Sequence, residues 1–173
     1  MVNMKYITVF RHGKSAQDSR FSDDFDRPLA RKGHRQIPRM AAFVARTKIR
    51  PDWIVSSPAQ RARQTAELLA EKLDYARPIV WNERAYLAPA LALLEILRQT
   101  PDEAEHALLV GHNPGLSDLV AGLCTSGDLR LNLQMPSAGL AVLAAQVVHW
   151  RQLRWGCADL LGYAAPRFLK GLA

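Results

Sequence analysis

Short apolar runs alternate with amphipathic stretches along the chain, and this alternation limits the possible folds more than any other feature. Residues 6–10, 53–55 and 107–110 have the length and the β-branched, aromatic or leucine-rich composition of buried strands. Apolar residues at helical spacing follow within 37–44 and within 59–73. Strands that alternate with helices predict an α/β fold with a mostly parallel sheet.

The rest of the chain continues the same pattern. Further strands are expected at 79–81 and, as a long central strand, at 139–148, while further helices are expected at 89–98 and 116–123. We expect an edge strand within 150–168.

Prolines and hydroxyl side chains mark where some of these elements begin and end. Ser56-Ser57-Pro58 is expected to open the second helix, with a hydroxyl cap and a proline in the first turn. Pro38 indicates either the start of a helix or a kink within it. Residues 16–28 are polar and contain Asp, Ser and Pro, so we expect a loop there.

Length and cysteine content restrict the class of protein. The 173 residues suit a single domain spanning residues 1–173. Cys124 and Cys157 are too few for a disulfide framework, and we interpret both as small buried apolar residues in a reducing compartment. The apolar run at 6–10 is too short for a signal peptide, and no stretch approaches the roughly 18 apolar residues of a membrane span. We therefore expect a soluble cytoplasmic protein with no membrane partner.

The positive charge is concentrated in one part of the chain. The formal net charge is +7, and the excess peaks between Arg27 and Arg50. This basic stretch contains no acid, and its basic residues are Arg27, Arg31, Lys32, Arg35, Arg39, Arg46, Lys48 and Arg50. Arg31, Arg35 and Arg39 are four apart and would share one helix face. The stretch is either a docking surface for an acidic or phosphorylated partner or a solvated helix face. Nucleic acid is the weakest option, because no aromatic residues interleave with the basic ones.

Polar residues stand where three of the predicted strands end. The three segments are Arg11-His12-Gly13, Ser56 to Arg61, and Gly111-His112-Asn113. In parallel sheets, ligands bind beyond the carboxyl ends of the strands. If the three strands are neighbours, two histidines and two arginines converge on one pocket.

Two histidines and two arginines suit a phosphoryl group. Arginine offers planar, bidentate donors that stay charged at any working pH, and a helix N-terminus adds backbone N–H groups. A neutral histidine can attack phosphorus, and a second, protonated histidine can stabilise charge in the transition state. This chemistry requires neither a metal nor another cofactor, and the sequence has no HExxH, P-loop or GxSxG pattern.

The polar segments resemble the motifs of a known family. Arg11-His12-Gly13, the segment Ser56 to Ala66 and the turn Gly111 to Gly115 are similar to the three motifs of the histidine phosphatase superfamily, and Asp26 to Leu29 with Gly33 matches a recurrent stretch of it. The short chain and Lys14-Ser15 resemble its SixA-like phosphohistidine phosphatase branch. The resemblance covers nearly the whole chain. It implies a three-layer α/β/α sandwich with a mostly parallel central sheet, phosphoglycerate mutase-like.

The resemblance also implies roles for individual residues. His12 would be the nucleophile that becomes phosphorylated. Arg11 and Arg61 would hold the phosphoryl oxygens, and His112 would be the second histidine of the phosphate pocket. Arg63 is the alternative pocket arginine, although its spacing favours a pairing on the helix surface.

Three further residues have less certain roles. Ser15 and Asn113 either donate to the phosphate or order the loops. Glu83 is the candidate for the acid that protonates the leaving group, and it could equally cap a helix or form a salt bridge with Arg84. A phosphohistidine substrate has less need of an acid, because its imidazole leaves as a neutral ring.

The chain length between two of these residues favours one substrate class. Only 28 residues separate Glu83 from His112, where the mutases and bisphosphatases of the superfamily have a longer insertion. This implies an open, shallow pocket, so we expect a metal-independent histidine phosphatase that dephosphorylates phosphohistidine on a protein. One alternative is a small-molecule phosphomonoesterase with the same histidine chemistry, acting on a small phosphate ester. A non-catalytic phosphate-binding adaptor is a further alternative, which the presence of all four pocket residues disfavours.

Overall fold

The computed structural model describes residues 4–17, 23–46, 50–126 and 131–169. Within these ranges one six-stranded sheet forms, with the strand order β3-β2-β4-β1-β5-β6. The strands are β1 (Lys5–Arg11), β2 (Trp53–Ser56), β3 (Val80–Trp81), β4 (His106–Gly111), β5 (Leu140–Ala145) and β6 (Ala158–Ala164).

The sheet combines a parallel part with an antiparallel part. Strands β3, β2, β4 and β1 pair in parallel, while β5 is antiparallel to β1 and β6 is antiparallel to β5. The predicted mostly parallel sheet is confirmed for the part that carries the histidine motifs. The predicted long central strand is β5, which lies inside the sheet, and the edge strand expected within 150–168 is β6.

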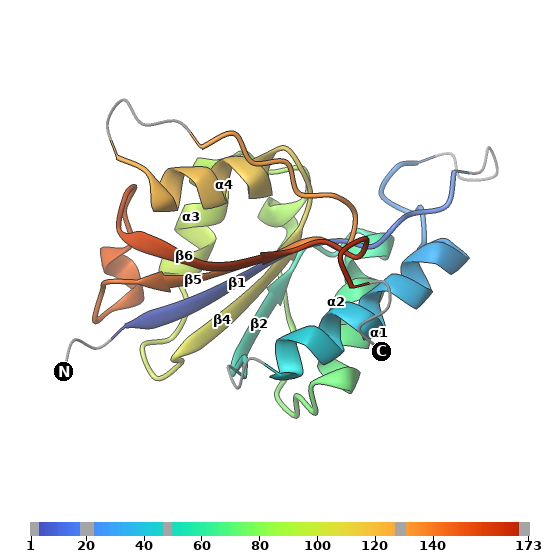
Figure 1. Cartoon of the computed structure of the whole chain (residues 1–173), viewed down its shortest axis with the longest axis horizontal. Helices are drawn as coiled ribbons and strands as arrows, with labels where there is room; N and C mark the ends of the chain where they lie inside the picture. Colours follow the sequence, from blue (N-terminus) through green and yellow to red (C-terminus); the bar gives the residue numbers. More distant parts are fainter. Residues whose placement is uncertain (1–3, 18–22, 47–49, 127–130, 170–173) are drawn as a thin grey trace.

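Helices cover both faces of the sheet, which confirms the three-layer α/β/α sandwich (Figure 1). The helices α1 (Arg31–Arg46) and α2 (Gln60–Lys72) lie on one face, and α3 (Ala90–Arg98) and α4 (Gly115–Cys124) lie on the other. Two short 3₁₀ turns, η1 (Glu83–Ala85) and η2 (Trp150–Gln152), complete the elements. No helix in the described ranges is both long and apolar enough to cross a membrane.

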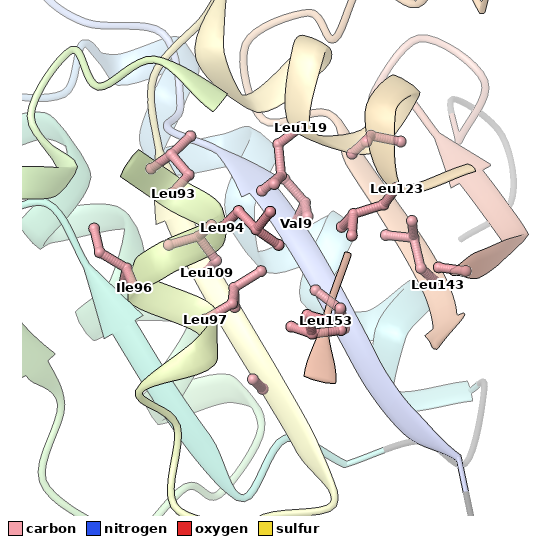
Figure 2. Close-up of a cluster of buried hydrophobic side chains, with 14 of the residues drawn as sticks. Val9, Leu93, Leu94, Ile96, Leu97, Leu109, Leu119, Leu123, Leu143 and Leu153 are labelled. Atoms are coloured by element: carbon pink, nitrogen blue, oxygen red, sulfur yellow. The ribbon is translucent and has the colours of Figure 1, made fainter. Parts of the chain in front are cut away.

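Each face of the sheet carries its own apolar core. Figure 2 shows the cluster under α3 and α4, where Leu97 and Leu119 face Val9 and Leu109 of the sheet. Burying each such leucine or valine stabilises the fold by about 1.5–3 kcal/mol. The cores hold the parallel strands in fixed register, so the strand ends form a rigid edge.

Two helix boundaries differ from the sequence prediction. Helix α1 begins at Arg31, so Pro38 lies inside the helix rather than at its start. Helix α2 begins at Gln60 after Ala59, and no side chain caps it, so the expected hydroxyl cap is wrong. Residues 18–22 of the expected loop and Lys48 of the basic stretch lie outside the described residues.

Gly115 shows why the turn after β4 needs a glycine where α4 begins. A Cβ atom at this position would lie 1.9 Å from the carbonyl oxygen of Ala88, which no packing adjustment of a side chain could relieve. The last glycine of the Gly111 to Gly115 turn is therefore required by the close approach of the segment that joins η1 to α3.

Candidate active site

The carboxyl ends of three neighbouring strands bring the candidate residues together. In the sheet β4 lies between β2 and β1, and the register pairs Arg11 with Gly111 and Ser56 with Val110. The residues that follow these strands therefore meet at one edge. The rings of His12 and His112 lie 5.0 Å apart between centroids.

The hydrogen bonds of His12 leave one of its nitrogens available for chemistry. Its Nδ1 lies 2.8 Å from the carbonyl oxygen of Gly13, and its Nε2 lies 3.3 Å from Nε of Arg61. A guanidinium can only donate, so Nε2 accepts and Nδ1 carries the proton. The Nε2 lone pair, which a nucleophile needs, consequently faces the arginine that would hold a phosphoryl group.

Thr65 of α2 fixes the backbone beneath His12. Its hydroxyl donates to the carbonyl oxygen of Arg61 at 2.7 Å and accepts from the backbone N–H of Gly13 at 3.1 Å. Gly13, whose carbonyl oxygen orients His12, is thereby tied through its N–H to the helix that carries Arg61. Sequence reasoning missed Thr65, because it reads as an ordinary buried residue on a helix.

The neighbours of His112 define its protonation as well. Its Nδ1 lies 3.3 Å from Nη2 of Arg61, which can only donate, and its Nε2 lies 2.9 Å from Oγ of Ser57. The Nε2 atom of His112 therefore carries the proton and donates to the hydroxyl. Ser57, which the sequence predicted to cap a helix, instead orients this histidine.

Both histidines of the site are neutral at neutral pH. The pKa of His12 is lowered to about 4, chiefly by burial and also by the charges of Arg61 and Arg11, against the opposing Gly13 hydrogen bond. Burial also lowers the pKa of His112 to about 3, together with the neighbouring His12 and Arg61. Without a bound anion, His112 is thus not the cation that the chemistry of a second histidine predicted.

The buried histidines predict that acid destabilises the protein. His106, at the opposite end of β4, also has a pKa lowered to about 4 by burial, whereas an unfolded histidine titrates near 6.5. The unfolded chain therefore binds more protons between pH 6.5 and 4. Accordingly, the free energy of unfolding should fall as the pH drops through this window, by up to about 1.4 kcal/mol per pH unit for each histidine.

Denaturant unfolding at pH 7, 6, 5 and 4.5 measures this dependence. The variant His106→Gln removes one of the three titrating groups and should flatten the slope. An unfolding free energy that stays constant from pH 7 to pH 4.5 would contradict the neutral, buried state of the histidines.

Arg61 lies at the centre of the site and is paired with a carboxylate of its own chain. Its side chain is 4% exposed, and its Nη2 lies 2.7 Å from Oδ2 of Asp24. The Tyr86 hydroxyl donates to the same carboxylate oxygen at 2.9 Å, and Arg27 forms an ion pair with the other oxygen at 2.7 Å. Asp24 and Tyr86 were missed by sequence reasoning, because a polar loop and a short turn carry no periodic signal.

Asp24 stays ionised in this setting. Burial by itself would raise the pKa of Asp24, but the hydrogen bonds from Tyr86 and Arg61 outweigh it, and the pKa lies below its ordinary value. An anionic ligand that binds Arg61 must therefore compete with a negatively charged side chain.

Replacing Asp24 with alanine should strengthen inhibition by inorganic phosphate. The carboxylate is 42% exposed, and a partly exposed ion pair contributes up to about 1 kcal/mol, so the inhibition constant should fall by about twofold to fivefold. Steady-state inhibition at fixed ionic strength measures it. Asp26→Ala, an exposed acid on the same loop, is the matched control, and an equal change in both variants would contradict the competition.

Arg11 and Asn113 share one main-chain acceptor. Nη1 of Arg11 and Nδ2 of Asn113 donate to the carbonyl oxygen of Met135 at 2.7 and 2.9 Å. Among the described residues, Nε of Arg11 and Oδ1 of Asn113 are buried without a hydrogen-bond partner. Burial also lowers the pKa of Arg11. The structure places Asn113 at the site edge, where it orders the loop at Met135.

The remaining candidates lie outside this cluster. Oγ of Ser15 accepts a hydrogen bond from Nη2 of Arg27 at 3.0 Å, so it orders the loop. Arg63 pairs with Glu67 at 3.4 Å and stacks over the ring of Trp81, as its spacing predicted. Among the described residues, no group of three or more His, Cys, Asp or Glu side chains is placed to hold a metal ion.

Glu83 lies on η1 with an exposed side chain, and no hydrogen bond among the described residues joins it to the histidines. The cap of η1 is Asn82, whose side chain accepts from the backbone N–H of Arg84 at 3.0 Å. The helix-cap role considered for Glu83 is thus taken by its neighbour.

Both histidines are buried, whereas the sequence led us to expect an open, shallow pocket. The segment between Glu83 and His112 forms η1, α3 and β4, and these elements belong to the layers of the sandwich. The ring of Tyr86 contacts His112 and Phe25 edge-on. His12 is 8% and His112 is 2% exposed.

The fold and the site together define a class of protein, an α/β protein with two buried histidines and an arginine gathered at the carboxyl ends of parallel strands. A family model of the histidine phosphatase superfamily (branch 1) matches residues 7–86. The uncharacterised protein Rv1276c of Mycobacterium tuberculosis is 32% identical over 163 residues, covering 91% of this chain and 99% of that protein. The chain belongs to the histidine phosphatase superfamily, and it is a phosphatase.

Solved structures are similar along nearly the whole chain. A protein of Agrobacterium tumefaciens assigned as the phosphohistidine phosphatase SixA has a TM-score of 0.76 and 28% identity, covering 94% of this chain and 98% of that one. The protein histidine phosphatase SixA complexed with tungstate has a TM-score of 0.80 and 21% identity, with coverage of 95% and 99%. The phosphoglycerate mutase-like fold and the SixA-like resemblance predicted from the sequence are confirmed.

Proposed function

We propose that this phosphatase removes phosphate from phosphohistidine on a protein, with His12 as the nucleophile. We assign the activity to one histidine phosphatase domain spanning residues 1–173. The Nε2 lone pair of His12 attacks phosphorus, and the P–N bond to the substrate imidazole, which is protonated on its other nitrogen, breaks with its electron pair moving to the ring nitrogen, so that a neutral imidazole leaves. Water then cleaves the new P–N bond at His12, which releases inorganic phosphate and restores the free lone pair.

Arg11, Arg61 and His112 hold the phosphoryl oxygens in this mechanism. The N–H groups of Arg61 contact both histidines and Asp24, so they point into the space between the rings. A bound dianion offsets the positive charge of the two arginines, which raises the pKa of His112. His112 can then carry a second proton and stabilise charge in the transition state.

The observation that carries the substrate assignment is that no protonated acid among the described residues lies beside the histidines. Asp24 is ionised because Tyr86 and Arg61 hold its pKa low, and Glu83 is exposed on η1. An alkoxide leaving group needs a proton from a positioned acid, whereas a phosphohistidine releases a ring that is stable when neutral. The site therefore favours a phosphoramidate bond over an ester bond.

One observation favours the small-molecule alternative. Asp24, Phe25 and Tyr86 contact one another beside the buried histidines, and a recessed site suits a compact ester. A histidine side chain that projects from a protein surface also fits such a pocket, so the two substrate classes are separated by rates rather than by shape.

Turnover of a phosphohistidine-bearing protein, compared with phosphoserine, p-nitrophenyl phosphate and a sugar phosphate, tests the proposal. We expect the highest kcat/KM for the phosphohistidine protein. The variants Glu83→Gln and Asp24→Asn should leave its kcat within about threefold, because no acid is needed there. A kcat/KM that is tenfold higher for any ester would refute the assignment, and a loss confined to esters in Glu83→Gln would restore Glu83 as the acid.

A further inference from the structure

A groove with basic walls leads away from the site, and its walls come from α1 and from residues 165–167 near the end of the described chain. Its charged side chains, which we call the basic groove, are Lys14, Lys32, Arg35, Arg39 and Arg167. The groove consists of adjoining pockets of about 340 Å³ and 330 Å³, and a third pocket of about 310 Å³ connects it to Arg11 and Asn113.

The three pockets adjoin one another because they share walls. Arg167 lines all of them, Lys32 lines the two beside α1, and Pro136 lines the two nearer the site. Neighbouring pockets therefore follow one another from Arg11, a candidate phosphate ligand, to Arg39 on the second half of α1. The basic groove thus lies next to the site.

Among the described residues, nothing compensates the positive charge of the groove. Its described walls include no aspartate or glutamate, and no ion pair in the described ranges involves any of its five charged side chains. All five are exposed. Several positive charges on a concave surface produce a focused electrostatic field that attracts anions.

The groove includes two of the three arginines that the sequence placed on one helix face, together with a neighbouring lysine. Lys32, Arg35 and Arg39 line the groove, whereas Arg31 does not. Arg167, about 130 positions further along the chain, completes the surface, and only the tertiary fold shows that it belongs there.

Length and composition indicate the ligand. A single phosphate ion would occupy a small part of one pocket, so the spread of charge over three pockets matches an elongated anion. Nucleic acid binds such grooves by stacking bases on aromatic rings, and among the described residues the only aromatic side chain that lines these pockets is Tyr163, at the end beside Asn113. An extended peptide with acidic side chains needs a row of cations, which the groove offers.

We propose that the basic groove binds an acidic segment of the phosphoprotein substrate while the phosphorylated side chain occupies the pocket at His12. This assignment rests on the proposed function. The acidic segment raises affinity for the protein substrate without taking part in the chemistry. Its contribution should therefore reside in KM and weaken with rising salt.

Charge reversal in the groove, with a control of equal charge on the same helix, tests the proposal. The groove variant is Arg35→Glu with Arg167→Glu, and the control is Arg31→Glu with Arg46→Glu, both exposed residues of α1 that line none of the three pockets. The substrates are one phosphohistidine peptide flanked by Asp and Glu, its Asn and Gln counterpart, and p-nitrophenyl phosphate.

We expect the groove variant to raise KM for the acidic peptide at least about tenfold at unchanged kcat. Its kcat/KM for the neutral peptide and for p-nitrophenyl phosphate should stay within about twofold of the native value. The control should change KM for the acidic peptide by less than about threefold. Equal losses for both peptides, or equal losses in groove variant and control, would overturn the proposal.

A binding assay separates this proposal from the proposed function. The unphosphorylated acidic peptide, labelled for fluorescence anisotropy, should bind the native chain and the control more tightly than the groove variant. If this holds while no phosphohistidine peptide is hydrolysed, the groove stands and the proposed substrate fails. If a single-stranded oligonucleotide displaces the peptide at lower concentration than poly-glutamate does, the groove is a nucleic-acid site and the proposal is overturned.

Discussion

Replacing His12 with alanine should lower kcat/KM by at least about 10³-fold on every substrate that the protein hydrolyses, because the loss of a nucleophile leaves only binding and electrostatic stabilisation. Native chain quenched during turnover should carry phosphate on His12, detectable by mass spectrometry without acid treatment. The alanine variant should carry none. Its fold should persist, because the sheet register and both cores lie away from this side chain.

His106→Gln is the matched control for that experiment. Like His12, His106 is buried and has a pKa lowered to about 4, but it lies at the other end of the sheet and its Nε2 contacts Oγ1 of Thr8 at 2.7 Å. The control should lose stability and keep its activity per folded molecule. Activity retained within tenfold in His12→Ala would refute the nucleophile assignment.

Replacing Arg61 with alanine should produce the second large effect. Its guanidinium contacts both histidines and Asp24. Its loss therefore removes N–H donors to the phosphoryl oxygens and the hydrogen-bond partner of the His12 Nε2 lone pair. Loss of one such buried donor lowers kcat by about 10²–10³-fold in a comparable setting. We expect a lower kcat, measured by steady-state kinetics, and a lower affinity for tungstate, measured by competition.

Arg63→Ala is the control, because it removes the same side chain two residues further along α2. Arg63 pairs with Glu67 and stacks on Trp81 at the helix surface, so kcat/KM should stay within about twofold. A larger loss in Arg63→Ala than in Arg61→Ala would exchange the two assignments and place the phosphate pocket on the other side of α2.

The strand ends could be predicted because each is marked in the local sequence. An apolar run followed by Arg11-His12 or Gly111-His112 specifies where a strand stops, and parallel neighbours bring such ends together. The order of the strands in the sheet places them as neighbours. The same local logic predicted that Arg63 would pair on the helix surface.

The cover of the site could not be predicted, because it depends on contacts between distant loops. Asp24 reaches Arg61 from 37 positions away, and Tyr86 reaches Asp24 from 62 positions away. A polar loop lacks the periodicity that reveals a helix or a strand. Ser57 shows the complementary difficulty. A hydroxyl before a helix predicts a cap, but the Ser57 oxygen instead contacts a histidine that follows another strand, and the local sequence does not show that contact.

The hydrogen bonds to the carbonyl oxygen of Met135 determine which sequence changes would disturb this site. It accepts from both Arg11 and Asn113, so the first and third motifs are coupled through an atom that every amino acid possesses. Substitution at position 135 leaves this acceptor in place, whereas an insertion or deletion in the loop before β5 would move it. Drift in loop length, rather than in residue identity, is therefore the change to which this pair of side chains is most sensitive, and a motif scan restricted to side chains does not detect it.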